Sequence, residues 1–201
     1  MRKLLFALYL ILPGLAAAQT VIGTAVVDGR EIEILSNSTW RFATPNPSAA
    51  GCTLVRDPVS FCGDPTRFQL LPVATSPVVT AQYQVDDRTY AMIIVEGLGR
   101  ADGINLRSFR ESVLLNAAAA FGNTPADIPI LDTYEITVEG ERHEGIAFSG
   151  TVSGLSITYY VTLVLQDRNA IQLITYVIGS GALPPQRVFH DEFVSLIRIA
   201  K

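Results

Sequence analysis

A glycine-rich stretch, residues 97–103, is the part of the sequence that most resembles a site for chemistry. It follows an apolar segment, precedes a helical pattern, and contains Gly97, Gly99, Arg100, Asp102 and Gly103. Dinucleotide sites place glycines at such a junction so that the backbone can approach a pyrophosphate at the helix amino terminus. The spacing here is one residue too long, and the segments after the helix predict hairpins, whereas a dinucleotide site needs a parallel crossover. We therefore expect a flexible connection and no cofactor, and this loop is the leading candidate surface for a ligand.

A hydrolase would need a nucleophile next to a base, and the chain has two histidines, His143 and His190. The serines nearest to a Gly-x-Ser-x-Gly pattern are Ser153, in a predicted hairpin turn, and Ser180, in a loop. His143 lies in a charged turn, where we expect it to be solvated. His190 falls beside the apolar stripe of the last helical pattern, which favours the surface or the helix edge. A hydrolase is therefore the weakest of the alternatives, and we expect no enzyme.

Neighbouring carboxylates occur in three places: Asp86 with Asp87, Glu139 with Glu141, and Asp191 with Glu192. A glycosidase needs two carboxyl groups that face each other across a cleft in different electrostatic environments. Adjacent acids in turns are usually solvated, and no series of regularly spaced oxygen ligands accompanies them to bind calcium. We expect neither a catalytic pair nor a metal.

The two cysteines, Cys52 and Cys62, predict a structural disulfide in an oxidising compartment. A metal site would need two further ligands, and a redox pair usually has two intervening residues, whereas nine separate these two. Closing so short a loop stabilises a fold by about 2–3 kcal/mol in the chain-entropy model.

The first residues have the three parts of a secretory signal peptide. Positive charge, an apolar run and a small-residue cleavage site follow one another at Arg2 and Lys3, residues 4–12, and Ala16 with Ala18. The run is much shorter than the ~20 apolar residues that span a membrane. We expect cleavage after Ala18 and export of the mature protein to the bacterial periplasm.

The charge of the chain argues against a nucleic-acid partner. Without the leader, 13 basic and 19 acidic residues remain, Lys201 is the only lysine, and the arginines are spread singly. Binding to a phosphate backbone requires clustered Lys and Arg. The hydrophobic content of 49% predicts a folded protein.

Consecutive hairpins form the most regular pattern in the sequence. Four apolar, β-branched segments cover residues 133–139, 144–152, 155–165 and 170–178. Turn residues separate them at Gly140, at Ser153 with Gly154, and at residues 167–169. We expect an antiparallel sheet that an earlier hairpin over residues 78–95 extends, with its most apolar strands covered on both faces.

Helical spacing of apolar residues predicts two helices, over residues 105–121 and 185–199. Together with the sheet they make an α+β domain over residues 67–201. Residues 19–42 predict a β-hairpin appendage that turns at Asp28 and Gly29, and we expect Trp40 to pack this appendage down. The Pro-rich residues 43–66, which contain both cysteines, predict a linker without a core of its own.

The order of these elements, the strand with Tyr159 and Tyr160 before a polar turn, and the closing helix with Phe193 and Ile197 resemble the PsbP-like family. That family includes extrinsic photosystem subunits and bacterial periplasmic relatives of the DcrB type. The resemblance covers residues 68–201. It implies a central antiparallel sheet sandwiched between helices, and an accessory or binding role.

These observations lead to two main hypotheses. The first is an exported, non-enzymatic periplasmic protein that binds another envelope protein or supports the envelope. The second is a carrier of a small apolar ligand, held in a groove between the sheet and the first helix. The small side chains of residues 117–120, all alanine, motivate the second hypothesis because they can leave room beside a sheet.

Overall fold

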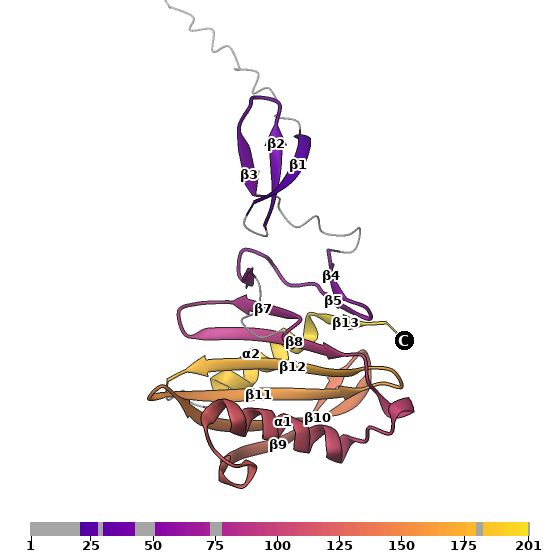
Figure 1. Cartoon of the computed structure of the whole chain (residues 1–201), viewed down its shortest axis with the longest axis vertical. Helices are drawn as coiled ribbons and strands as arrows, with labels where there is room; N and C mark the ends of the chain where they lie inside the picture. The colour runs from indigo at the N-terminus through magenta and orange to yellow at the C-terminus, as the bar shows by residue number, and fades with distance from the viewer. Residues whose placement is uncertain (1–20, 28–29, 43–50, 73–77, 180–182, 201) are drawn as a thin grey trace, which may run out of the picture. The chain divides into compact units, whose positions relative to one another are not determined.

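The computed structural model describes residues 21–27, 30–42, 51–72, 78–179 and 183–200 (Figure 1). The chain forms two compact units, Met1–Thr44 and Pro45–Lys201. The expected signal peptide and the expected turn at Asp28 and Gly29 lie outside the described residues.

The first unit is a three-stranded antiparallel meander. Its strands are β1 (Val21–Val27), β2 (Arg30–Leu35) and β3 (Trp40–Phe42), in that order across the sheet. The side-chain oxygen of Asn37 accepts a hydrogen bond from the Thr39 backbone N–H at 3.1 Å, which helps turn the chain between β2 and β3. Trp40 lies opposite Ile34 in this sheet, and its side chain is 59% exposed.

The second unit is built on a seven-stranded sheet whose neighbouring strands are all antiparallel. The spatial order is β6 (Gln69–Leu70), β7 (Ala81–Gln84), β8 (Thr89–Glu96), β12 (Ala170–Ile178), β11 (Leu155–Leu165), β10 (Glu141–Val152) and β9 (Ile130–Val138). The predicted four-strand meander and its union with the earlier hairpin are confirmed. At the β9–β10 turn, Glu139 and Gly140 have φ values of 49° and 82°, the backbone of a two-residue type I′ turn.

One helix covers each face of this sheet. Because side chains alternate along a strand, Ile171 and Leu173 of β12 pack with Phe193 of helix α2 (Leu183–Ser195), in one cluster. Ala170 and Ile174 of the same strand belong to a second cluster, with Phe109 and Val113 of helix α1 (Leu106–Phe121). The expected α+β sandwich is therefore present (Figure 1).

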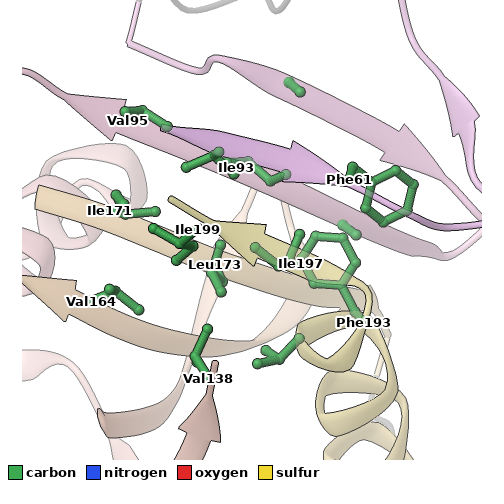
Figure 2. Packing of buried hydrophobic residues seen from close by; sticks show 14 of the residues in the cluster. Phe61, Ile93, Val95, Val138, Val164, Ile171, Leu173, Phe193, Ile197 and Ile199 are labelled. Atoms are coloured by element: carbon green, nitrogen blue, oxygen red, sulfur yellow. The ribbon is translucent and has the colours of Figure 1, made fainter. Parts of the chain in front are cut away.

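A small second sheet completes the cover on the α2 face, and it differs from what the sequence pattern predicted. It contains β4 (Thr53–Arg56), β5 (Val59–Phe61) and β13 (Ile197–Ile199), in the order β13-β5-β4. Residues 51–62 are therefore not a linker without a core, because Val59 and Phe61 are buried in the same cluster as Phe193 and Leu173. Figure 2 shows Phe61 close to Phe193. The last helix ends at Ser195, and the chain then forms a strand.

The predicted disulfide between Cys52 and Cys62 is present and joins the two ends of the β4–β5 hairpin. The backbone N–H of Cys62 donates to the carbonyl of Leu196 at 2.8 Å. The disulfide therefore fixes the hairpin that carries Val59 and Phe61 beside the carboxyl-terminal strand.

Candidate functional site

The glycine-rich loop between β8 and α1 is a well-bonded turn. Arg100–Asp102 forms a single 3₁₀ turn, and the Asp102 carboxylate accepts a hydrogen bond from the Gly99 N–H at 2.8 Å. Gly103 closes the turn with φ 84°, and its N–H donates to the Arg100 carbonyl at 3.0 Å. This bonding differs from the flexible connection expected from the sequence.

The same loop is fixed onto the turn between β11 and β12. The backbone N–H groups of Arg100 and Ala101 donate to the carbonyls of Gln166 and Asp167 at 3.0 and 2.9 Å. Gly99 allows this contact, because a Cβ at position 99 would overlap the backbone of both acceptor residues. The absence of a side chain at Gly99 therefore lets two segments of the protein approach each other closely. In phosphate-binding loops, glycine lets the backbone approach a ligand in the same way.

The topology rules out a dinucleotide fingerprint in this loop. β8 pairs antiparallel with β12, and the strands that follow α1 form antiparallel hairpins, so the described sheet has no parallel crossover. The amino terminus of α1 is occupied by its own cap, since Asn105 accepts from the Ser108 N–H at 3.0 Å.

A cleft of about 520 Å³ opens beside this loop, at one end of the sheet. β10 and β11 pair only as far as Glu144 and Leu163, although β10 begins at Glu141 and β11 continues to Leu165. The cleft lies where the two strand ends stop pairing. Its polar lining comes from Arg100, from the β4–β5 turn, from the β9–β10 turn with the start of β10, and from the β11–β12 turn: Asp57, Glu139, Glu141, His143, Gln166, Asp167, Arg168 and Asn169.

A second hollow of about 370 Å³ adjoins the first. It reaches the start of α1 at Asn105 and Leu106. The two hollows share Arg100, Glu141, His143 and Leu165. Of the loop residues proposed from the sequence, Arg100 lines both hollows, whereas Gly99, Asp102 and Gly103 shape the loop that presents it.

The cleft carries charges of both signs. The Arg100 guanidinium lies 3.9 Å from the Asp167 carboxylate, and Arg198 lies 3.6 Å from Glu139. His143 lies within β10 and is half-buried, so the expectation of a solvated turn residue is wrong. Burial lowers the pKa of His143, with the Glu141 carboxylate acting in the opposite direction and Arg100 in the same one. The imidazole is therefore neutral at pH 7, and the four carboxylates of the lining outnumber its two arginines.

His190 is buried completely, and its expected place at the surface or the helix edge is wrong. Its two ring nitrogens lie 2.8 Å from the Thr162 hydroxyl and 2.9 Å from the Thr175 hydroxyl. The rings of Tyr134 and Tyr160 flank it, at 6.0 and 5.8 Å between centroids. A base enclosed in this way cannot reach a substrate, so His190 is part of the core and not of an active site.

The paired acids serve turns and ion pairs. Asp86 accepts hydrogen bonds from the N–H groups of Arg88 and Thr89, both at 2.8 Å, in the β7–β8 turn. Asp191 pairs with Arg187 at 2.7 Å, and Glu192 pairs with Arg67. Among the described residues no cluster of three or more His, Cys, Asp or Glu side chains could hold a metal ion.

The alanines of α1 do not border either hollow. Ala118 is 1% exposed and packs in the core cluster on the α1 face. Close packing of the helix against the sheet therefore accounts for the small side chain at position 118. The two hollows lie at the opposite end of the helix, near Leu106. None of the described helices is long and apolar enough to cross a membrane.

Comparisons with known proteins find a fold and no sequence relative. No protein-family profile matches the sequence, and no curated protein matches it. The solution structure of cyanobacterial PsbP (CyanoP) from Synechocystis sp. PCC 6803 is similar, with a TM-score of 0.52 and 11% identity over 72% of this chain and 88% of that chain. A crystal structure from Bacteroides thetaiotaomicron VPI-5482 matches 72% of this chain and 46% of its own, with 9% identity and a TM-score of 0.46. The similarity to the cyanobacterial PsbP structure confirms the fold expected from the order of elements.

Replacing Gly99 with alanine tests the close approach of the loop to the β11–β12 turn. We expect Gly99→Ala to lower the free energy of unfolding by about 1–3 kcal/mol, because the new methyl group meets backbone atoms. Gly97→Ala is the matched control, since a Cβ there meets nothing within 4 Å and should change stability by less than about 0.5 kcal/mol. Urea unfolding of both variants measures the difference. Equal small losses of stability would show that the loop can move away from the β11–β12 turn and would contradict the prediction.

The enclosed His190 should make the protein sensitive to acid. Burial, reinforced by the Arg187 charge, lowers the pKa of His190 to about 3. Between this pH and the ordinary value near 6.5, the unfolded chain binds a proton that the folded protein excludes. The free energy of unfolding is therefore highest above about pH 6.5. It falls by about 1.4 kcal/mol per pH unit as the pH decreases from 6.5 toward 3.

The measurement is the free energy of unfolding from pH 7 to pH 4 for the wild type and for His190→Gln, which carries no titrating ring. We expect the wild type to lose stability more steeply with acid, and parallel curves would contradict the assignment. The titratable groups around the ring are Tyr134, Tyr160 and Arg187, and all of them remain in the variant. NMR titration of the wild-type imidazole checks the same claim without a mutation, since the His190 ring should stay neutral at pH 5.

Proposed function

We propose that this chain, whose second unit has the PsbP-like fold, is an exported, non-catalytic protein that binds a partner protein of the cell envelope. The cleft beside Arg100 is its recognition site. The sequence of residues 1–18 supports export, and the Cys52–Cys62 disulfide fits an oxidising compartment.

The observation that carries this proposal is the composition of the cleft. Its walls alternate arginine and carboxylate side chains with the amides of Gln166 and Asn169, and apolar Val164, Leu165 and Ile199 lie between them. A small apolar ligand would leave these charges unsatisfied, and a simple anion would meet twice as many carboxylates (four) as arginines (two). A polypeptide surface carries the same mixture of charged, amide and apolar groups, and it is the occupant that matches this lining.

The mode of binding follows from the rigidity of the walls. The Arg100 loop is hydrogen-bonded to the β11–β12 turn, and the β9–β10 turn is a tight two-residue hairpin. Both walls are therefore formed before a partner arrives, which limits the conformational entropy lost on binding.

A double charge reversal in the cleft tests the proposal. The full-length chain with Arg100→Glu and Arg168→Glu is compared, by cross-linking in cells of the source organism, with Arg107→Glu, an exposed α1 residue outside the cleft. We expect the wild type and the Arg107 variant to capture the same envelope protein, and the cleft variant to lose at least about tenfold of it, because like charges now face the partner.

The location of the protein is measured in the same samples. We expect the mature chain to begin at Gln19 and to lie in the periplasmic fraction. Equal capture by the cleft variant would contradict the recognition site, and an uncleaved chain in the cytoplasm would contradict export.

A further inference from the structure

The strand β9 (Ile130–Val138) is a long open edge of the main sheet (Figure 1), and β6 is the other edge in the strand order. β6 has two residues, so it offers almost no template for another strand, whereas β9 has nine. The inner edge of β9 is fully engaged with β10 from Val138 to Asp132, where the register shifts. The outer edge has no strand beside it in the described part of the chain.

The register fixes which backbone groups point outward. In a two-residue hairpin the residues that flank the turn form a hydrogen-bonded pair, and such pairs then alternate along the ladder. Val138 and Glu141 flank the turn, so every second β9 residue from Val138 bonds to β10. The residues between them, Thr133, Glu135 and Thr137, direct their N–H and carbonyl groups away from the sheet.

One side chain, that of Arg187, covers part of this edge. The Arg187 guanidinium of α2 donates to the Glu135 carbonyl at 3.4 Å, is held by the Asp191 carboxylate at 2.7 Å, and lies 3.6 Å above the Tyr134 ring. Within the described part of the chain, the bond from Arg187 to the Glu135 carbonyl is the one hydrogen bond to an outward backbone group of residues 133–137. Edge strands of stable monomers are usually blocked by prolines, bulges or inward charges. Here the bulge lies at the start of β9, and the run from Thr133 to Thr137 remains open.

The side chains around the edge indicate what would add to it. Asp132 and Glu135 are exposed carboxylates on opposite faces of the strand, and Ile130 and Leu131 are each 40% exposed at its start. Glu135 pairs with Arg142 at 3.5 Å, but both side chains are exposed by more than 70%, so this surface pair is weak and leaves the carboxylate open to a basic side chain of a partner. A second copy of this acidic chain would bring the same carboxylates toward each other across a two-fold axis, which is unfavourable. An extended segment with basic residues opposite the two acids and apolar residues opposite the exposed pair complements the edge.

We propose that β9 binds an extended, basic segment of a partner protein, which adds to the main sheet as an antiparallel strand. The backbone of Thr133 and Thr137 supplies the hydrogen bonds, and the neighbouring acids select basic side chains. Arg187 lowers the affinity, since its bond to the Glu135 carbonyl must break before that group can accept from the added strand. This surface lies on the outer edge of the sheet and uses none of the Arg100 loop.

The probe is a synthetic nine-residue peptide of alternating valine and threonine, with lysines placed opposite Asp132 and Glu135 and a fluorescent label. A second peptide has the same sequence but carries N-methyl groups on the amides that would face β9. We expect the first peptide to bind in an anisotropy titration and the N-methylated peptide to bind at least tenfold more weakly, although the two have equal charge.

Matched variants of the protein locate the binding. Thr137→Pro removes an N–H that the fold itself does not use, whereas Thr137→Ala keeps it. We expect the proline variant to bind the peptide about fivefold more weakly than the alanine variant, and Arg187→Ala to bind it more tightly than the wild type. The double variant Arg100→Glu with Arg168→Glu should bind the peptide as the wild type does, which separates this surface from the recognition cleft.

Equal binding of the two peptides, or equal binding by the two Thr137 variants, would overturn the proposal. If the proline variant does not fold, amide NMR of the wild type with the first peptide decides the question. Shifts centred on Thr133, Glu135 and Thr137 are expected, and shifts confined to any other part of the chain would contradict the proposal.

Discussion

The cover over both faces of the central strands is the constraint on which the rest of the molecule depends. β12 is apolar at consecutive positions, and Ile171 and Leu173 on one face are as completely buried as Ala170 on the other. Neither face can meet water without loss of this burial, so the sheet needs α1 on one side and α2 with the β13-β5-β4 sheet on the other. The disulfide and the carboxyl-terminal strand contribute to this cover, because they hold Val59 and Phe61 over the face of the sheet that α2 covers.

This double cover determines where recognition can occur. The core contains the His190 imidazole, whose two ring nitrogens are hydrogen-bonded to the hydroxyls of Thr162 and Thr175. Because the ring is completely buried, no substrate can reach it. The groups left for a partner lie at the rim of the sheet, where β10 and β11 separate beside Arg100 and where β9 has no neighbour. This arrangement leaves the accessible polar groups at the edges of a rigid interior, which is what the proposed binding role requires.

The parts of the fold that follow local rules could be predicted from the sequence. The hairpins after Thr133 have apolar alternation and turn residues such as Gly140, and α1 has both its spacing and its caps, Asn105 and Gly122. The short strands β5 and β13 escaped prediction because each has three residues and is stabilised by pairing across most of the chain length. His190 was misplaced for the same reason, since its burial depends on hydroxyls from β11 and β12. The cleft could be predicted only through Arg100, because the end of the β10–β11 pairing leaves no sequence signal.

Residue-resolved amide hydrogen exchange of the free protein tests the central claim most directly. If the sheet is a rigid, doubly covered scaffold with its open groups at the rim, the amides of Ile93, Val161 and Leu173 will exchange only through global unfolding. The outward amides of Thr133 and Thr137 will exchange without it. Exchange of the three central amides by local opening, at rates similar to those of β9, would show that the cover is loose and would contradict the account.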